Sequence, residues 1–575
     1  MYVDTVVSRQ RRKDGTVREY SSVLLRRSVR DGAKVGKQTL ANLSMLPAAA
    51  VEAVRAVLAG KTLLEAESVL QVRRSLPHGH VALVHAQAKA LGLPKLLGPG
   101  CRARDLAYAL IISRAVEPDS KLSTLSWWDD VTLGVDLGVA GASTDEVYAA
   151  MDWLLSRQDA IEAALAGRHL AEGGMALFDL SSSWVEGAQC ALAARGYSRD
   201  GKRGKAQVEY GLLTDPVGRP VAIRVFAGNT GDPTAFAEAV KVVRTEFRLQ
   251  RLTMVGDRGM ITSARVDAIK DDPDNQLGWI TCLRAPQIAK LAADDGPLQM
   301  SLFDTQDLAE ITHPDYPGER LIACRNPALA AQRARKRQDL LTATEKLLDP
   351  IVARVTDGKL VGADAIGVAV GKVIGKYKMA KHFHLAITDT SFDYQRLQVG
   401  IDAEAALDGI YVIRTSVTTD TLDTAGVVGA YKALSHVERD FRSIKVDDLD
   451  LRPIYHYLTD RVKAHILICM LACYLTWHLR HALAPLTYTD EHSPLRANPV
   501  TAAHVSPEAA RKASRHTDND GNPIRSFQNL LRHMATLTRN TICYHDTTFD
   551  KITPPTPTQK RAFELIGAPL PITLT

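Results

Sequence analysis

Apolar and polar positions alternate over the first 45 residues, which is the pattern of β structure. The segment YSSVLLRRSVR is followed by Asp31-Gly32 and then by AKVGKQTLANL. Two such runs around an Asp-Gly turn predict a basic β-hairpin or small sheet. A helix is expected next, over residues 47 to 58, and from 76 to 170 the apolar residues recur at helical spacing, which predicts a helical region.

The following β signals come in a definite order. A hairpin joins the second and third strands through DPVGRP, and helices follow Asp232-Pro233 and lie near 263 to 270. The five strands are MALFDL (175–180), VEYGLL (208–213), VAIRVFA (221–227), RLTMVGDRG (251–259) and LGWITCLR (277–284). Strand, hairpin, helix, strand, helix, strand is the order of a ribonuclease H-like sheet. The predicted fold class is therefore α/β, with a mixed sheet flanked by helices.

These patterns divide the chain into a basic N-terminal region (1–75), a helical region (76–170) and the first part of the core (171–285). The helical region is a candidate DNA-binding domain, or only a structural cap, since no recognition-helix motif decides between them. Residues 286–405 interrupt the core. They hold a long polar helix, 329 to 348, closed by Pro350, and a basic stretch, 371 to 383, so we interpret them as an inserted domain. The core resumes over 406–485. Residues 486–575, rich in Pro, Thr, His and Asn, are expected to be a loosely packed tail with one helix near 525 to 537.

The stretch YKALSHVERDFRSIK, Tyr431 to Lys445, is predicted to be one helix. Positions seven apart return to nearly the same direction on a helix, so Tyr431, Glu438 and Lys445 share a polar face, with Arg442 close beside it. The apolar residues of the stretch, Val437, Phe441 and Ile444, lie on another side and can pack. The polar face can then line a cleft. The alternative is a solvated helix with ion pairs at i,i+4.

Size and charge narrow the class of protein. A chain of 575 residues with 46% hydrophobic and 24% charged residues can bury several cores. The net charge is +6, and the first 40 residues alone carry ten Lys and Arg against four acidic residues. A concentrated basic segment suits a polyanion partner, although a merely basic, soluble surface gives the same count.

Cysteine usage and hydropathy favour the cytoplasm. The seven cysteines show no CxxC spacing, which argues against a disulfide framework. The N-terminus lacks the apolar run of a signal peptide. The most apolar helix, 465 to 477, is shorter than the roughly 20 residues that a membrane span needs, so we expect it to be buried within the protein and expect no membrane association.

Three carboxylates carry the candidate chemistry. Asp179 and Asp257 end the first strand and the strand after the first helix, and Glu438 lies on a helix that can pack across the sheet. Neighbouring strands are about 4.8 Å apart, so the two aspartates can meet in one site. Such oxygens suit Mg²⁺, and two ions can serve an in-line phosphoryl displacement. Singly, each acid could be an ordinary turn or strand-end residue.

These residues resemble a known family, the DDE transposases of bacterial insertion sequences, in the group with a YREK signature. Tyr431, Glu438 and Lys445 fit the signature, whereas Leu434 stands where the family has arginine, so Arg439 or Arg442 would have to supply that contact. The segments FDLSSSWVEG, FAGNTGDP, VGDRGMI and RPIYH extend the resemblance over 170 to 480. The resemblance implies that Asp179, Asp257 and Glu438 are the catalytic, metal-binding triad. It also implies that Tyr431 and Lys445 contact DNA phosphate beside them, with Arg442 and Arg258 nearby.

The glycine-rich loop from Gly196 to Lys205 is not a nucleotide-binding loop. Arg203 occupies the position where Ser or Thr would hold Mg²⁺, and the loop precedes a strand instead of opening a helix. We therefore expect no nucleotide cofactor. Its basic residues suit phosphate contacts near a scissile bond, unless they are simply solvated: Arg199, Lys202, Arg203 and Lys205.

The sequence thus predicts a transposase that binds the terminal inverted repeats of its own element and catalyses metal-dependent DNA cleavage and strand transfer. The resemblance implies Mg²⁺, two ions, with Mn²⁺ able to substitute, and at least a dimer when two ends are brought together. It places the protein in the cytoplasm, at the nucleoid when acting. The alternatives are a ribonuclease H-like nuclease without strand transfer and a noncatalytic DNA-binding descendant of a transposase.

Overall fold

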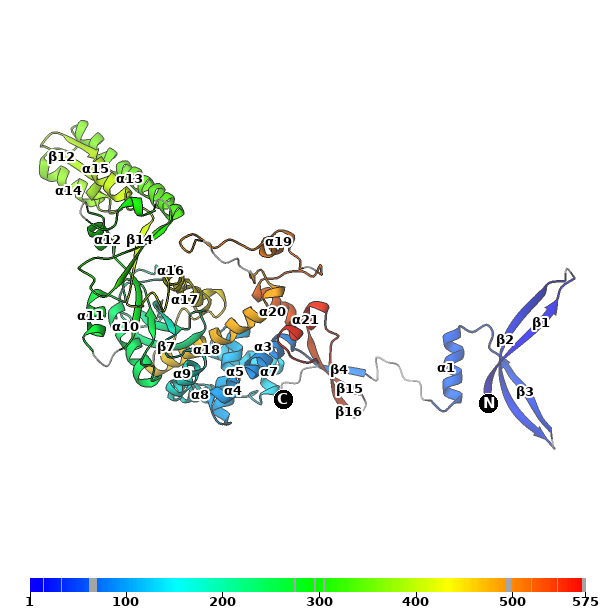
Figure 1. Cartoon of the computed structure of the whole chain (residues 1–575). Helices are drawn as coiled ribbons and strands as arrows, with labels where there is room; N and C mark the ends of the chain where they lie inside the picture. Colours follow the sequence, from blue (N-terminus) through cyan, green and yellow to red (C-terminus); the bar gives the residue numbers. More distant parts are fainter. Residues whose placement is uncertain are drawn as a thin grey trace. The chain divides into compact units, whose positions relative to one another are not determined.

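The structure is a computed structural model that describes residues 1–13, 15–32, 34–61, 70–272, 276–293, 296–303, 306–491, 498–518, 520–544 and 547–570. The chain forms two units (Figure 1). The first holds Met1–Leu76 and Thr538–Thr553, and the second holds Pro77–Leu537 and Pro554–Thr575. Residues 62–69 of the predicted N-terminal region lie outside the described residues.

The first unit contains two small sheets. Strands β1 (Tyr2–Arg11), β2 (Val17–Asp31) and β3 (Lys34–Asn42) form an antiparallel sheet in the order β1-β2-β3, as the alternating pattern predicted. Helix α1 (Ala48–Leu58) packs on β1. The second sheet has the order β16-β15-β4 and joins β4 (Leu70–Pro77) to β15 (Thr538–Tyr544) and β16 (Thr547–Ile552).

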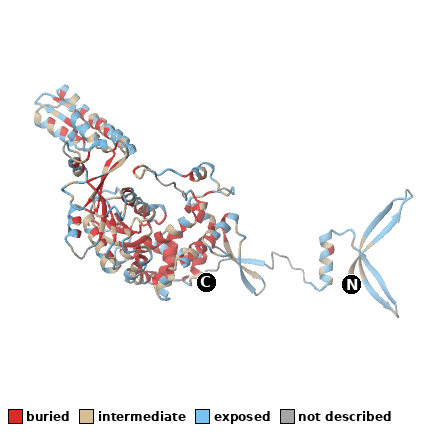
Figure 2. Ribbon diagram, in the orientation of Figure 1, coloured by how far each residue is buried: buried red, intermediate tan, exposed pale blue. Residues whose placement is uncertain are grey.

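The β1-β2-β3 sheet buries little of its surface. No described residue of its strands reaches the buried class, and most are exposed (Figure 2). A sheet normally packs one apolar face against another element. This sheet instead presents basic side chains to solvent, and Arg9 and Arg27 pair only with other exposed residues of the sheet, Glu19 and Gln38. A basic surface of this kind is free to meet a polyanion.

An eight-stranded mixed sheet is the centre of the second unit, in the order β10-β11-β14-β9-β8-β5-β6-β7. Strands β5, β8 and β9 are parallel to one another, and the remaining pairs are antiparallel. The strands are β5 (Met175–Trp184), β6 (Gln207–Thr214), β7 (Pro220–Ala227), β8 (Thr253–Val255), β9 (Gly278–Cys282), β10 (Leu308–Ile311), β11 (Arg320–Arg325) and β14 (Ile410–Thr415). This is a ribonuclease H-like arrangement, as predicted.

Helices cover both faces of this sheet. On one face, Phe178 of β5 meets Phe236 of α10 (Asp232–Lys241), with ring centroids 6.2 Å apart. On the other face, Tyr210 of β6 meets Phe441 of α17 (Leu434–Arg442), at 5.7 Å. Helix α10 continues into a π-helical turn, η1 (Val242–Glu246), and α11 (Ser263–Lys270) and α12 (Ala285–Leu291) follow β8 and β9. The two faces of β5 therefore contact different helices.

A helical layer precedes the sheet, as predicted for 76–170. It consists of α3 (Gly79–Ala90), α4 (Leu93–Leu97), α5 (Arg102–Val116), α6 (Lys121–Asp130), α7 (Thr132–Asp136), α8 (Thr144–Ser156) and α9 (Gln158–His169). Helix α18 (Thr459–Ala482) packs on α3, α5, α8 and β7. Because α18 contacts both the layer and the sheet, it joins them into one core.

Helix α18 also has the length and composition of a membrane span, and among the described residues it alone does. However, 83% of its 18-residue apolar window is buried inside the protein. Its apolar surface is therefore used by the core, which agrees with the sequence-based expectation.

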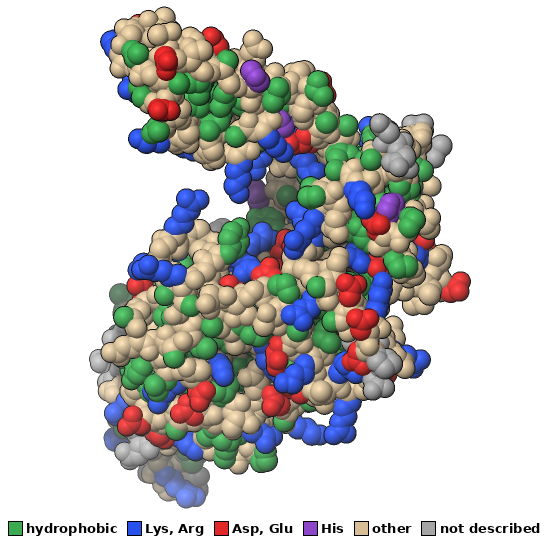
Figure 3. All heavy atoms as spheres, turned by 90° about the vertical axis from the view of Figure 1, so that its left-hand side faces the viewer, with side chains coloured by type: hydrophobic (Ala, Val, Ile, Leu, Met, Phe, Trp, Pro, Cys, Tyr) green, Lys and Arg blue, Asp and Glu red, His purple; other side chains and the backbone are tan. Residues whose placement is uncertain are grey.

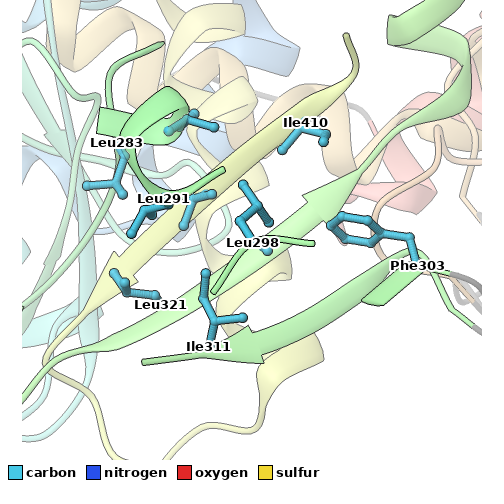
Figure 4. Close-up of a cluster of buried hydrophobic side chains, with 10 residues drawn as sticks. Leu283, Leu291, Leu298, Phe303, Ile311, Leu321 and Ile410 are labelled. Carbon is cyan, nitrogen blue, oxygen red and sulfur yellow. The ribbon is translucent and has the colours of Figure 1, made fainter. Parts of the chain in front are cut away.

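The predicted insertion, 286–405, divides in two. Strands β10 and β11 extend the central sheet, and Leu298, Phe303 and Ile311 pack there with Leu321 and Ile410 (Figure 4). The rest forms a lobe with its own core, built from α13 (Pro327–Thr356), α14 (Ala363–Ile374), η3 (Ala380–His382), β12 (Phe383–Ile387), β13 (Phe392–Arg396) and α15 (Gln398–Ala405).

The prediction that Pro350 closes the long helix was wrong. Helix α13 runs through Pro350 to Thr356. A proline inside a helix removes one hydrogen bond and costs roughly 3 kcal/mol. Leu348, Ile351 and Val355 are buried in the core of the lobe, and burying three such side chains can contribute more than this. Packing thus overrides the local preference.

The C-terminal residues are more ordered than their composition predicts. Helix α20 (Phe527–Ala535) lies where one helix was expected, and α19 (Pro507–Arg515) and α21 (Pro557–Leu565) are added to it. Helices α20 and α21 pack on α3, with Leu530, Met534 and Phe563 buried. Helices α20 and α21 are therefore part of the core of the second unit, whereas Thr538–Thr553 between them belongs to the first unit.

Candidate active site

Asp179 and Asp257 are brought together by strand register. Strand β5 pairs in parallel with β8, and Leu177 is the partner of Val255. Each aspartate lies two residues beyond its paired residue. In neighbouring parallel strands, about 4.8 Å apart, equal steps from a paired position lead to adjacent positions. The sheet thus places the first two predicted acids side by side.

Glu438 approaches the same place from above the sheet. Its helix, α17, packs on β5 and β6. Side chains alternate along β5, and Ser183, which lies on the same face as Asp179, is hydrogen-bonded through its hydroxyl to that of Tyr210 at 2.8 Å. Tyr210 in turn packs on Phe441 of α17. Asp179 therefore faces the helix that carries Glu438.

The single helix predicted over 431–445 is in fact three segments. Tyr431 lies in the last turn of α16 (Thr424–Lys432), Glu438 lies in α17, and Lys445 lies in a π-helical turn, η4 (Ser443–Asp447). The wider π turn shifts the spacing after Arg442, and Ala433 (φ −62°, ψ −16°) separates the first two segments. Tyr431 and Glu438 nevertheless both lie near the two aspartates, because the charge of Asp257 acts on Tyr431 and the charge of Glu438 acts on Asp179. The apolar side was predicted correctly: Val437, Phe441 and Ile444 are all buried.

The three carboxylates share one electrostatic environment. Burial is the main cause that raises the pKa of Asp179 to about 7, and the negative charges of Asp257 and Glu438 raise it further. The N–H of Leu180, which donates to Asp179 at 2.8 Å, and the charge of Arg199 act in the opposite direction. The ionised form of Asp179 therefore needs more positive charge than the protein supplies.

Divalent cations fit this donor set. Carboxylate oxygens are hard ligands of the kind that Mg²⁺ and Mn²⁺ prefer, and a cation would relieve the repulsion on Asp179. As they stand, no three His, Cys, Asp or Glu side chains in the described part of the chain are close enough to hold a metal ion. At Asp257, Oδ1 accepts a hydrogen bond from the N–H of Gly259 in its own turn. A carboxylate has a second oxygen with which it can bind a cation while it keeps such a bond.

Tyr431 lies against this site. Its hydroxyl is hydrogen-bonded to the thiol of Cys282 in β9. Burial raises the pKa of Tyr431 far above its usual range, and Cys282 and the charge of Asp257 add to this. The phenol therefore stays protonated beside the acids, with a partner already in place.

Lys445 and Arg199 are engaged by acidic residues. Lys445 donates to Asp200 at 2.9 Å, and the same carboxylate accepts a hydrogen bond from Arg452. Arg199 lies 2.5 Å from Asp232 and 3.5 Å from Glu209. Both basic residues thus hold the loop 196–205 against the core, and neither presents a free charge in this structure.

The sequence profile of the family described as "Transposase DDE domain" matches residues 185–475. That span is just over half of the chain and includes Asp257, Glu438 and the lobe. The chain belongs to the DDE transposase family. Such transposases are enzymes that act on DNA, and their cleavage and strand transfer reactions depend on divalent metal ions. Asp179 lies six residues before the matched span.

Comparisons with curated proteins and with solved structures give no further evidence about function. No curated protein matches the chain. Among solved structures, this transposase resembles the cryo-EM structure of a piggyBac transposase synaptic complex with hairpin DNA, at 9% identity and a TM-score of 0.32. The match covers 80% of this chain and 76% of the other. At that score the likeness carries no argument about mechanism.

The remaining loop cations of the transposase differ in what they contact. Lys202 Nζ lies 5.3 Å from the ring centroid of Trp184, and the guanidinium of Arg452 lies 5.2 Å from the same centroid. Lys205 pairs with Glu186 at 3.0 Å, and Arg203 is exposed. Lys202 and Arg203 are both exposed, whereas Lys205 is paired with Glu186, so Lys202 and Arg203 are the loop residues most open to a ligand.

Arg258 and Arg442 are both exposed. Arg258 lines a hollow of about 710 Å³ between the lobe and the sheet, together with Arg333 and Lys336 of α13 and Lys381. Figure 3 shows Lys and Arg side chains along the walls of the space below the lobe. Arg333 and Lys336 belong to the RARKR segment of the long polar helix, to which the sequence-based prediction gave no role. The density of basic residues there was the available signal.

Proposed function

We propose that Asp179, Asp257 and Glu438 are the catalytic residues of this transposase. The observation that supports this most strongly is the shared electrostatic environment: the charges of Asp257 and Glu438 raise the pKa of Asp179, although 78 and 259 positions in the chain separate them from it. Structural carboxylates are usually paired with cations or hydrogen-bond donors. Three acids that repel one another are instead typical of a site that awaits a cation.

The three acids and Tyr431 would have different roles. Asp179 within β5 and Asp257 two residues beyond β8 would supply oxygen ligands, and Glu438 would close the site from the helix above. When bound, two Mg²⁺ ions, or Mn²⁺ in their place, would activate the attacking oxygen and stabilise the leaving oxygen of a phosphodiester. Tyr431, held by Cys282, would position the DNA strand beside Asp257.

The substrate would be the terminal inverted repeats of the element, followed by target DNA. Lys445, which fits the YREK signature, would contact phosphate near the cleaved bond, and Arg442 would supply the contact of the arginine that Leu434 replaces. Lys202, Arg203 and Lys205 would add contacts from the loop, and Arg199 would hold that loop in place. Arg258 would contact the backbone from the hollow below the lobe. Joining two ends implies at least a dimer, with no nucleotide cofactor and no membrane partner, acting at the nucleoid.

The basic sheet of residues 1–45 would contribute nonspecific phosphate contacts. Its strands carry many Arg and few Asn or Gln, and backbone contacts of this type position a protein on DNA without reading sequence. Deleting residues 1–45 should weaken binding to all DNA to a similar extent. A selective loss of end recognition would contradict this role.

In the decisive experiment, labelled DNA that carries the element's end is incubated with the full chain in Mg²⁺, Mn²⁺ or EDTA. The products are then separated on a denaturing gel. We expect cleavage with either metal, none with EDTA, and at least a hundredfold loss in Asp257→Asn and Glu438→Gln with end binding retained. The matched control, Glu238→Gln on α10, should cleave normally. Wild-type cleavage rates in Asp257→Asn would refute the assignment.

The same gel separates the alternatives. Products in which the end is joined to target DNA identify strand transfer, whereas nicks alone indicate a nuclease. Specific binding without cleavage under any metal would favour a noncatalytic DNA-binding protein.

A further inference from the structure

A second cavity, of about 540 Å³, lies where α5 and α6 meet the segment 450–456. Its walls include Arg114 and Lys121, and each of these residues is only 5% exposed. Removing a charge from water costs several kcal/mol unless an opposite charge compensates for it. Two buried cations in one cavity therefore call for a counter-ion.

The direct partners of both cations are neutral. Arg114 donates to the backbone carbonyl oxygens of Leu449 at 3.3 Å and Asp119 at 2.6 Å. Lys121 Nζ lies 3.1 Å from Nδ1 of His465. The other nitrogen of that ring, Nε2, faces a backbone carbonyl at 3.4 Å, so Nε2 carries the proton and Nδ1 accepts the hydrogen bond from the lysine. These contacts orient the cations without neutralising them.

The acidic residues of the cavity do not pair directly with either cation. Asp119 and Asp450 line it, but among the residues that the structure describes neither forms a salt bridge with Arg114 or Lys121. The carboxylate of Asp119 instead accepts a hydrogen bond from the N–H of Ser120 at 2.6 Å. Burial raises the pKa of Asp450, and the charge of Arg114 lowers it, so Asp450 offsets part of the charge of Arg114 without contacting it.

The other groups that face the cavity are cationic or neutral. Arg452 lines it while bound to Asp200, and Arg461 stacks on Tyr148, 4.2 Å from the ring centroid. His456, whose ring lies 5.2 Å from that of His465, is kept neutral because burial and nearby cations lower its pKa to about 3. The positive charge that faces the cavity therefore comes from Arg114 and, below about pH 7, from Lys121.

The pKa of Lys121 shows the effect of burial and of the nearby positive charge. Burial, with the charge of Arg114, lowers the pKa of Lys121 to about 7. It is also the first residue of α6, a ten-residue helix, whose N-terminus carries partial positive charge. An anion placed against Lys121 and Arg114 would hold the ammonium charged and satisfy its unused N–H groups.

We infer that the cavity between Arg114, Lys121 and the segment 450–456 is a binding site for a phosphate group. Given the proposed function, on which the choice of source rests, the group is a backbone phosphate of bound DNA. A free phosphate or nucleotide would use the same contacts, and the experiments below distinguish the two sources.

The first experiment tests the site with sulfate, which stays a dianion throughout the pH range used. Thermal unfolding of the full chain is compared in sodium sulfate and in sodium chloride of equal ionic strength. Wild type and Lys95→Met, an exposed lysine of the same helical region, should gain more in Tm from sulfate than Lys121→Met. The extra gain should be larger at pH 6 than at pH 8.5, because Lys121 must be protonated to bind. General effects of sulfate act on all three proteins alike.

The second experiment measures DNA affinity against salt concentration without metal. If the anion is a DNA phosphate, Lys121→Met should lower the slope of log Kd against log salt by about 1, whereas Lys95→Met should not. An unchanged slope with a lost sulfate effect would overturn the DNA assignment and identify a free anion. No difference between Lys121→Met and wild type in either experiment would overturn the site.

These measurements are independent of cleavage. Both use binding or stability without metal, so they hold even if Asp179, Asp257 and Glu438 prove not to be catalytic. Methionine is close to lysine in length, and replacing a buried charge with an apolar side chain is often neutral or stabilising, so the variant should fold. Lys121→Arg, which keeps the charge, should retain at least part of the sulfate effect.

Discussion

Lys445 lies 2.9 Å from a carboxylate oxygen of Asp200, and the two side chains are only 9% and 2% exposed. The same acid binds Arg452. One buried carboxylate on the loop 196–205 thus compensates two cations from the segment that follows Glu438. These contacts hold the loop against the second part of the core, residues 406–485, which is distant from the loop in sequence.

Replacing that acid should therefore be costly. In Asp200→Asn, the buried Lys445 and the half-buried Arg452 would lose their shared counter-charge, and breaking a buried pair in this way typically costs about 3 kcal/mol. We expect a loss of this size in the free energy of unfolding, measured by urea denaturation. The exposed neighbour variant Asp447→Asn should change it by less than about 0.5 kcal/mol. Equal stability of the two variants would show that the buried pair does not hold the loop.

The high pKa of Asp179 predicts how stability depends on pH without metal. Its pKa is about 7 in the folded protein, against 3.8 as the ordinary value. The folded state therefore binds more protons between these values, so this contribution to the free energy of unfolding is present at pH 4 and is lost as pH rises through 7. Other buried acids with raised pKa, such as Glu162 and Asp440, act in the same direction.

The difference between wild type and Asp179→Asn isolates this residue. Unfolding measured from pH 4 to 8.5 in EDTA should show a smaller decline in the variant. At pH 8, added Mg²⁺ should raise the Tm of wild type and have little effect on Asp179→Asn. Identical pH profiles would mean that Asp179 is not the perturbed group.

The hollow below the lobe predicts a graded effect on DNA binding. Arg333→Gln and Lys336→Gln together should weaken binding to every DNA sequence similarly and lower the slope of log Kd against log salt by about 2. Arg354→Gln removes a charge from the same helix, α13, but outside the hollow, and should leave the slope unchanged. A change of specificity instead of overall affinity would show that these residues contact bases.

The proline inside α13 offers a test of the lobe's packing. Pro350→Ala would supply a missing backbone donor, so the free energy of unfolding of the lobe should rise by about 1–3 kcal/mol. Hydrogen exchange of the α13 amides would report this locally. Ala353→Gly, three residues on, should lower protection by roughly 1 kcal/mol. Loss of protection in Pro350→Ala would mean that the ring itself is needed for packing.

The relation of Asp179 to Asp257 could be predicted because it depends on strand order alone. Both residues end short apolar runs, and the hairpin and helix between them permit a parallel pairing. The burial of Val437, Phe441 and Ile444 followed equally from local spacing. Local sequence patterns and the order of the elements therefore predicted much of the part of the fold that holds these acids.

What could not be predicted depends on distant contacts. Arg114 meets the carbonyl of Leu449 across 335 positions, and nothing near either residue in sequence indicates that contact. The break at Ala433 and the π turn after Arg442 arise where helices must fit the sheet. Likewise, the sequence predicts β10 and β11 to be part of the insertion, and only the pairing of β11 with β14 shows that they belong to the central sheet.

Strand β4, near residue 70, pairs with β15, near residue 540. Translation therefore imposes an order on assembly, because β15 leaves the ribosome long after the catalytic sheet is complete. A nascent chain would hold all three acids before its second small sheet could close. A product truncated between residues 483 and 537 would contain the eight-stranded sheet and all three acids but would lack β15 and β16. Its N-terminal unit would stay unfinished, so this pairing makes synthesis of the C-terminal strands a condition for a complete protein.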